Sequence, residues 1–420
     1  MNEQLVVKNF GPIKDTTVDF KRVTVFIGPT GGGKSTLAKL AAIVKQKHLL
    51  QFDKADAQDL MVEYGMLNYF HEDETHIKWR QANELGFSLG ASDIDAHDKS
   101  LDMNQILIDD YEENYEKYKE EISTTLTDLI NEPERPRRQK DFLSSIGSDI
   151  NSFIKRWIEE KYQSIMFVSL PHYIPAERLF LAAIGESWPG IIRDDIGLPK
   201  LLVSFANQYS VARKSIGMLA MPFLSTQYTH NEGKDFIKLS GNDAVLPLHE
   251  AASGIQSVTP LLVLLEHLSR NTEQAQSFII EEPELNLFPL AQFELVKILV
   301  DKCARLDGKN DLVLTTHSPY VLTALNLLCY AYRIAQQDEA TAKKVAKLIP
   351  RHCWIDPDQF AAYYVDRPGT KRKQQVRSII NKKTGLIEEN ELDTASDELG
   401  AIFDKLVRLR KPAASPSRAN

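Results

Sequence analysis

The sequence predicts an α/β fold, and three observations indicate it. An apolar stretch typical of a strand, residues 23–27, is followed by a glycine-rich turn and then by a helical run. Two later apolar stretches, 278–280 and 312–314, end in acidic or hydroxyl-bearing side chains at a spacing that fits a strand–helix–strand unit. Alternation of strands and helices is typical of α/β proteins. Each polar strand end is therefore a candidate for chemistry.

Composition places the chain among globular proteins. It has 420 residues, of which 43% are hydrophobic and 26% charged, so one large or two medium domains can form a full core. No apolar run approaches the ~20 residues that span a bilayer, and the first residues lack the pattern of a secretory signal. The three cysteines are far apart and predict neither disulfides nor a zinc site. A cytoplasmic protein is expected.

The segment 28–36, Gly-Pro-Thr-Gly-Gly-Gly-Lys-Ser-Thr, predicts a phosphate site. Its glycines let successive backbone N–H groups point inward, and the helix that follows adds the positive end of its dipole. Lys34 is expected to reach the β- and γ-phosphates, and the Ser35 hydroxyl to bind Mg²⁺. An ordinary glycine-rich turn is disfavoured by the full spacing in a strand–loop–helix context. The predicted ATP-binding residues are Gly28, Thr30, Gly31, Gly32, Gly33, Lys34, Ser35 and Thr36.

Adjacent carboxylates end the second apolar stretch. Glu281 is predicted to face Mg²⁺, and Glu282 to orient and deprotonate the attacking water. The two acids can differ in role because alternate residues of a strand face opposite ways. Alone, an apolar strand that ends in Glu-Glu would be weak evidence.

Two further segments complete the candidate site. Thr315-Thr316-His317-Ser318 ends the third apolar stretch, and His317 is predicted to sense or stabilise the γ-phosphate; a structural histidine is the alternative. Ser253 and Gly254 precede a helical run, and Ser253 could simply be its N-cap. In the functional interpretation Ser253, Gly254 and Gln256 complete the nucleotide site of another subunit.

The remaining chain is divided by composition. The stretch 55–161 is polar, charged and helix-like, an apolar strand is predicted at 164–168, and a hairpin at 236–246. The predicted units are 1–54, a first ATPase lobe; 55–163, a helical insertion; 164–198, a returning strand segment; 199–276, a helical lobe with the Ser253 segment; 277–335, the second half of the first lobe; 336–410, a C-terminal α/β extension; and 411–420, a disordered tail.

These motifs, taken in order, resemble the ABC-type ATPase domains of the chromosome-maintenance and double-strand-break-repair group. More closely, Glu281-Glu282-Pro283-Glu284 and Tyr173-Ile174-Pro175-Ala176-Glu177-Arg178 resemble the AAA15 class related to overcoming-lysogenization-defect nucleases. The resemblance implies a phosphate-loop ATPase head with a mixed sheet flanked by helices, a helical lobe and a helical insertion. It also implies a head-to-tail homodimer with two ATP molecules between the subunits, in which residues 283–286 communicate between sites.

Two departures from the family pattern concern the metal side of the site. Glu281 stands where most ABC-type ATPases carry aspartate. No glutamine loop is recognisable, and the 175–178 segment takes its topological place, so Glu177 or Arg178 is expected to contact metal or phosphate.

The resemblance leaves two functions open. Stand-alone ATPases of this class resemble sensor subunits of antiphage systems of the PARIS or Septu type, which imply a separate Toprim or HNH nuclease as partner and a phage-encoded trigger. Asp356 and Asp358 are predicted to cap a turn, so no fused nuclease is expected. The alternative is a DNA-repair or DNA-maintenance ATPase that clamps duplex DNA. A net charge of −8 gives no overall sign of a nucleic-acid binder, and whether DNA binds stays open.

Overall fold

A six-stranded sheet forms the centre of the protein. The computed structural model describes residues 3–45, 54–71, 74–80, 86–90, 170–184, 197–241, 244–272, 274–369, 374–387 and 400–406. The strand order is β14-β13-β3-β12-β11-β6, and all neighbours are parallel except β13 and β14. The predicted mixed sheet is therefore confirmed. The strands are β3 (Val23–Ile27), β6 (Leu170–Ile174), β11 (Gln276–Glu281), β12 (Asp311–Thr316), β13 (Phe360–Val365) and β14 (Val376–Ser378).

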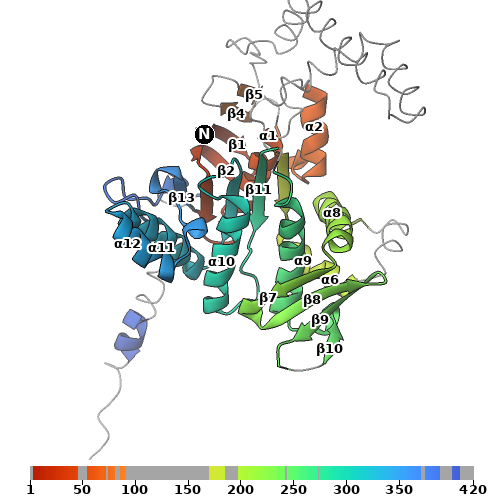
Figure 1. The fold of residues 1–420 in the computed structure, drawn as a ribbon. Coiled ribbons are helices and arrows are strands. Elements are labelled where there is room, and N and C mark those ends of the chain that lie inside the picture. Colours follow the sequence, from red (N-terminus) through yellow and green to blue (C-terminus); the bar gives the residue numbers. More distant parts are fainter. Residues whose placement is uncertain are drawn as a thin grey trace, which may run out of the picture.

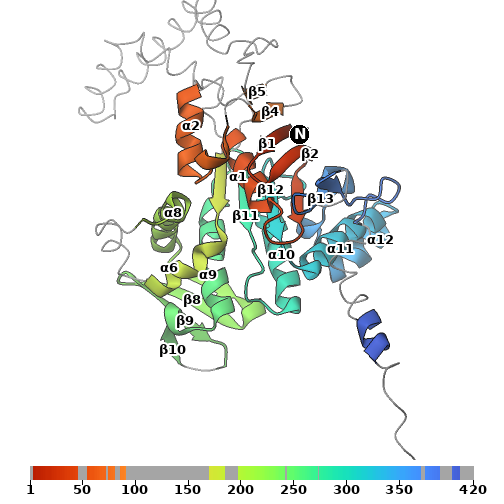
Figure 2. The same ribbon diagram turned by 180° about the vertical axis from the view of Figure 1, so that it is seen from behind.

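Both faces of this sheet are covered, which explains why its strands are continuous apolar runs. Alternate residues of β11 point into different cores: Ile280 joins the cluster on one face and Ile279 the cluster on the other. The first face carries α9 (Ser253–Leu268), α10 (Pro289–Cys303) and α11 (Pro319–Ala335). The second face carries α1 (Lys34–Val44). Figures 1 and 2 show these two sides of the sheet.

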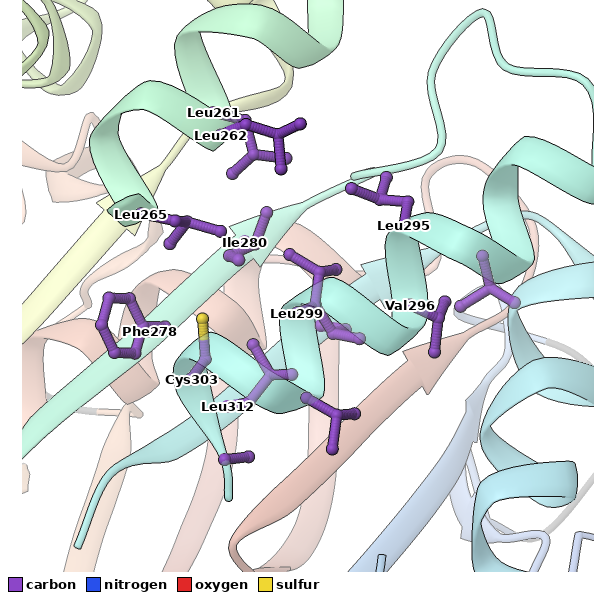
Figure 3. Close-up of a cluster of buried hydrophobic side chains, with 14 of the residues drawn as sticks. Leu261, Leu262, Leu265, Phe278, Ile280, Leu295, Val296, Leu299, Cys303 and Leu312 are labelled. Atoms are coloured by element: carbon purple, nitrogen blue, oxygen red, sulfur yellow. The ribbon is translucent and has the colours of Figure 1, made fainter. Parts of the chain in front are cut away.

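The larger core lies where α9 and α10 meet the sheet. Leu261, Leu262 and Leu265 of α9 face Phe278 and Ile280 of β11, as Figure 3 shows. The apolar face of α10 closes the same cluster. It contributes Leu295, Val296, Leu299 and Cys303, and β12 adds Leu312. Burial of this apolar surface fixes the helices that carry Ser253 and the residues after Glu282.

A second sheet is antiparallel, with the order β2-β1-β4-β5. Its strands are β1 (Glu3–Phe10), β2 (Ile13–Phe20), β4 (His76–Arg80) and β5 (Gly86–Gly90), and α2 (Lys54–Glu63) precedes β4. The insertion predicted as helical at 55–163 therefore also contains the strands β4 and β5. Ile77 and Trp79 alternate inward with a period of two, opposite Val7 and Leu5. Residues 91–169, which include the strand predicted at 164–168, lie outside the described part.

A third sheet, with the order β10-β9-β8-β7, stands in the predicted helical lobe. The hairpin of β9 and β10 is confirmed, but β7 and β8 make the region mixed. Asp235 of β9 ties this sheet to a helix, because its carboxylate accepts hydrogen bonds from the hydroxyls of Tyr209 at 2.8 Å and Tyr228 at 2.7 Å. The elements are α6 (Leu179–Ile184), α8 (Lys200–Ile216), β7 (Met218–Met221), β8 (Thr226–Asn231), β9 (Lys234–Leu239) and β10 (Val245–Pro247).

The C-terminal region completes the central sheet. After α12 (Glu339–Leu348), β13 inserts beside β3, so the predicted extension at 336–410 shares the main core. Asp356 accepts a hydrogen bond from the backbone N–H of Asp358, which confirms the predicted turn. In the described residues no helix is long and apolar enough to cross a membrane.

Candidate functional site

The candidate site lies at the edge where the parallel strands end. β12 stands between β3 and β11, so the turn that follows each of these strands lies beside the turn that follows the next strand in the sheet. Thr316 is in register with Ile27, at the start of the phosphate loop, and Thr315 with Glu281. The topology therefore brings the loop, the acidic pair and His317 together. Ligands of open α/β sheets bind at this edge.

Two glycines of the phosphate loop combine a left-handed backbone with close contacts to other segments. Gly28 has φ 146°, and a Cβ there would lie 2.1 Å from the carbonyl oxygen of Val365 in β13. Gly33 has φ 106° and precedes α1; a Cβ there would lie 2.6 Å from Ile13. Only glycine adopts this backbone at both positions without strain, and at Gly28 a Cβ would also collide with the backbone of Val365. The loop is thus held between the N-terminal hairpin and β13.

Lys34 is buried inside the loop. Its ammonium group donates hydrogen bonds to the carbonyl oxygens of Gly28 at 2.8 Å and Pro29 at 3.1 Å. Burial lowers the pKa of Lys34 to about 8, although the charges of Glu282, Glu281 and Glu284 act in the opposite direction. A cation is therefore placed where an anionic phosphate would bind, beside three acids.

Nucleotide affinity should fall as the pH rises above about 8. The free protein then loses the Lys34 proton, while phosphate oxygens at the loop favour the charged ammonium, so binding must take up a proton. The dissociation constant is expected to rise roughly tenfold per pH unit above 8. Ionisation of the phosphate, with a pKa of about 6, is complete below the pH range in which Lys34 loses its proton. Calorimetry in two buffers of different ionisation enthalpy measures the affinity and the proton uptake. An affinity that does not change between pH 7.5 and 9.5 would contradict the prediction.

Glu281 has the features of a cation ligand. Its side chain is buried, with a residue exposure of 5%, and its Oε1 atom has no hydrogen-bond partner. Burial raises its pKa, while the neighbouring hydroxyls of Ser35 and Tyr173 favour the charged form. An orphaned buried carboxylate oxygen beside a serine hydroxyl fits Mg²⁺, which binds through one or two protein oxygens and substrate phosphates. Among the described residues, no group of three or more His, Cys, Asp or Glu side chains is placed to hold a metal ion.

Glu282 and His317 form a pair at the mouth of the site. The Nε2 atom of His317 lies 3.3 Å from Oε1 of Glu282, and both side chains are partly exposed. The hydrogen bond from His317 is the main cause that lowers the pKa of Glu282, so its carboxylate is charged. Glu282 also has φ 41°, a strained value for a residue other than glycine, and its N–H donates to Thr315. Such strain concentrates at functional sites.

Glu284 belongs to the 283–286 segment expected to communicate between sites, but no individual role was predicted for its side chain. Its Oε1 atom accepts hydrogen bonds from the Thr316 hydroxyl at 2.5 Å and from the His317 backbone N–H at 3.1 Å. This buried carboxylate joins the turn after β11 to the end of β12 and so fixes His317 beside Glu282. The signal available in the sequence was the Glu-Pro-Glu spacing opposite a strand that ends in two threonines.

The Ser253 segment lies at the start of α9. Ala252 is the N-cap and Ser253 is the first helical residue, so the capping alternative for Ser253 is wrong. Gly254 lies against the turn after β11, since a Cβ there would be 2.6 Å from the Asn286 carbonyl oxygen. The amide of Gln256 donates to the carbonyl oxygens of His249 and Ala251 in the preceding turn. Among the described residues, Ser253 is exposed and makes no hydrogen bond to its own phosphate loop.

Arg178 differs from expectation. Its side chain is 0% exposed, and its guanidinium donates to four backbone carbonyl oxygens, so the expected contact with metal or phosphate is not supported. Burial lowers the pKa of Arg178 to about 10, which leaves it charged at neutral pH. Glu177 is exposed, and its charge raises the pKa of nearby Glu281. A metal contact of Glu177 stays a prediction.

Comparison with protein families shows the family of this chain. A family model described as AAA ATPase domain (AAA_15) matches residues 1–169 and 197–322. The chain belongs to this family. It is an ATPase with the predicted α/β fold. No protein of curated function matches the sequence.

Three solved structures are similar in part to this AAA ATPase domain. The SMC head domain from Thermotoga maritima is 12% identical over 77% of this chain and 92% of its own, with a TM-score of 0.33. An SmcHead bound to the C-winged helix domain of ScpA is 13% identical over 76% of this chain and 90% of its own, with a TM-score of 0.31. The recombination mediator protein RecF is 12% identical over 76% of this chain and 94% of its own, with a TM-score of 0.24.

Proposed function

We propose that the chain hydrolyses ATP with Mg²⁺ in a site that two copies complete together. The observation that carries the proposal is the pairing of a buried, unpartnered Glu281 oxygen with a charged Glu282 held by His317. Glu282 orients a water molecule and accepts its proton as the oxygen bonds to the γ-phosphorus and ADP leaves. Lys34 and the loop amides bind the phosphates. Mg²⁺, held by Ser35 and Glu281, would neutralise phosphate charge.

Exposed apolar side chains around the site support a second copy as the partner. Phe288 and Leu290, at the start of α10, are 74% and 73% exposed, and Tyr320, at the start of α11, is 53% exposed. The two helix starts are joined by a hydrogen bond from the Ser318 hydroxyl to Gln292 at 2.5 Å. Large apolar groups gathered at a site edge mark interaction surfaces. Closure by a second copy would bury them and bring its Ser253 to the γ-phosphate.

Replacement of Ser253 with arginine should separate binding from hydrolysis. We expect ATP affinity within about threefold of the parent, and turnover lowered about 10²-fold, because the arginine blocks the contact in trans and the loss resembles that of an oxyanion donor. Turnover and equilibrium binding of the pure variants check it. The matched control is Ser215→Arg, an exposed serine of α8. Normal hydrolysis by Ser253→Arg would refute the shared site.

The resemblance to stand-alone AAA15 ATPases extends the proposal to a role as sensor and scaffold in antiphage defence. In this role the ATP-bound oligomer holds a separate Toprim or HNH nuclease and releases or activates it when a phage-encoded trigger appears. A nuclease that copurifies with the chain, with growth arrest on its release, would support the role. Retention of duplex DNA instead, dependent on ATP and weakened by salt, would favour a DNA-maintenance ATPase.

A further inference from the structure

Arg178 stands at the junction of three segments of the site. Its Nε atom donates to the carbonyl oxygen of Ser257 in the second turn of α9, at 3.1 Å. Its Nη1 atom donates to Pro175, which precedes Arg178 in the turn after β6, at 3.1 Å, and to Glu281 at 2.7 Å. Its Nη2 atom donates to the carbonyl oxygen of Glu282 at 2.7 Å. One side chain thus holds the backbone of both catalytic acids and the helix of Ser253.

The chemistry of these contacts makes them directional. All four acceptors are backbone carbonyl oxygens, and the neighbouring acids Glu284, Glu282 and Glu281 supply the opposing charge without replacing these bonds. A guanidinium presents its donors in a rigid planar fork. The four bonds can be kept together only while the three segments hold one relative arrangement.

We infer that Arg178 is a positioning residue that fixes the start of α9, and with it Ser253, relative to the metal-binding and basic carboxylates. Ser253 precedes Ser257 by four residues, which is about one helical turn or roughly 6 Å along the axis. A shift of the backbone at Glu281 or Glu282 is therefore passed to the residue offered to the partner subunit. The inference rests on the proposed shared site.

Mixed dimers isolate the effect of Arg178 in trans. Glu282→Gln and Ser253→Arg should each lose most of the turnover, but a mixed dimer contains one site with the Glu282 of one subunit and the Ser253 of the other. Turnover should return when the two are mixed. The Glu282→Gln subunit supplies Ser253 to the active site and is called the donor. It is then replaced by a donor with the double variant Arg178→Lys/Glu282→Gln. Lysine keeps the charge but lacks the planar fork.

In the mixture with Ser253→Arg, turnover should be at least about tenfold lower with the double variant than with Glu282→Gln. The reason is that a misplacement of a site residue by roughly 1 Å can lower the rate about 10²-fold. Both donors must bind ATP equally and unfold at similar temperatures. Equal restoration by the two donors would overturn the inference. Failure of the first mixture to regain activity would instead refute the shared site, so the two results are distinguishable.

Hydrogen exchange gives a second measurement that leaves Arg178 intact, in case the lysine variant does not fold. The full chain with Ser253→Arg, in which most turnover should be lost while ATP still binds, is compared with and without ATP and Mg²⁺. Protection of the amides at 255–259 should increase, whereas those of α12 should not change. Unaltered exchange at 255–259 with nucleotide bound would overturn the coupling.

Discussion

Replacement of Glu282 with glutamine is expected to lower ATP turnover by about 10²–10⁴-fold, which is the usual contribution of a positioned general base. Glutamine keeps the size of the side chain and its bond from His317 but cannot accept a proton from water. The phosphate loop and Glu281 are untouched, so ATP should still bind. The trapped nucleotide should then stabilise the closed oligomer. Phosphate release at saturating ATP, with bound nucleotide measured in parallel, checks both halves.

Glu294→Gln is the matched control for this change. Glu294 lies in α10, pairs with Lys297 at 2.8 Å, and is partly exposed, so the same chemical change there should leave turnover unaltered. Undiminished turnover by Glu282→Gln would show that the base lies elsewhere. Loss of ATP binding together with turnover would mean that Glu282 holds the loop and not the water.

Lys34→Ala should remove most of the nucleotide affinity. The ammonium group is the buried cation of the loop, and Glu281, Glu282 and Glu284 surround it with negative charge. Without it, phosphates would approach those acids with no compensating charge. Truncation of one partner of a buried charged pair costs about 2–5 kcal/mol, which corresponds to roughly 30- to 4,000-fold in affinity. Titration with a fluorescent ATP analogue measures it.

The matched control for Lys34 is Lys297→Ala, which removes an amine from the Glu294 pair on α10. That variant should bind ATP like the parent, because surface ion pairs contribute little. Tight binding by Lys34→Ala would contradict the assigned role of the loop lysine.

Local patterns were sufficient to nominate the residues of the candidate site. The loop 28–36 could be identified because its glycines and lysine act through their own backbone and helix, within a few residues of sequence. Glu281, Glu282 and His317 could be assigned because parallel strands carry their ends to one edge. The structure adds their mutual geometry, in particular the strained backbone of Glu282 and its 3.3 Å contact with His317.

Contacts between segments distant in sequence could not be predicted. β13 lies beside β3 although more than 300 residues separate them, and its Val365 determines how close the loop glycine Gly28 can lie. Arg178 was expected at metal or phosphate, because the 175–178 segment takes the topological place of the glutamine loop. Its burial depends on the carbonyl groups of α9 and β11, which sequence periodicity does not place.

Sedimentation velocity of Glu282→Gln, with and without ATP and Mg²⁺, tests the central claim most directly. A site shared between two copies predicts a single-subunit species without nucleotide and a species of two copies, or a multiple of two, with it. Addition of Lys34→Ala to the same chain should abolish the shift. A species that stays a monomer while ATP is measurably bound would contradict a site shared between two copies.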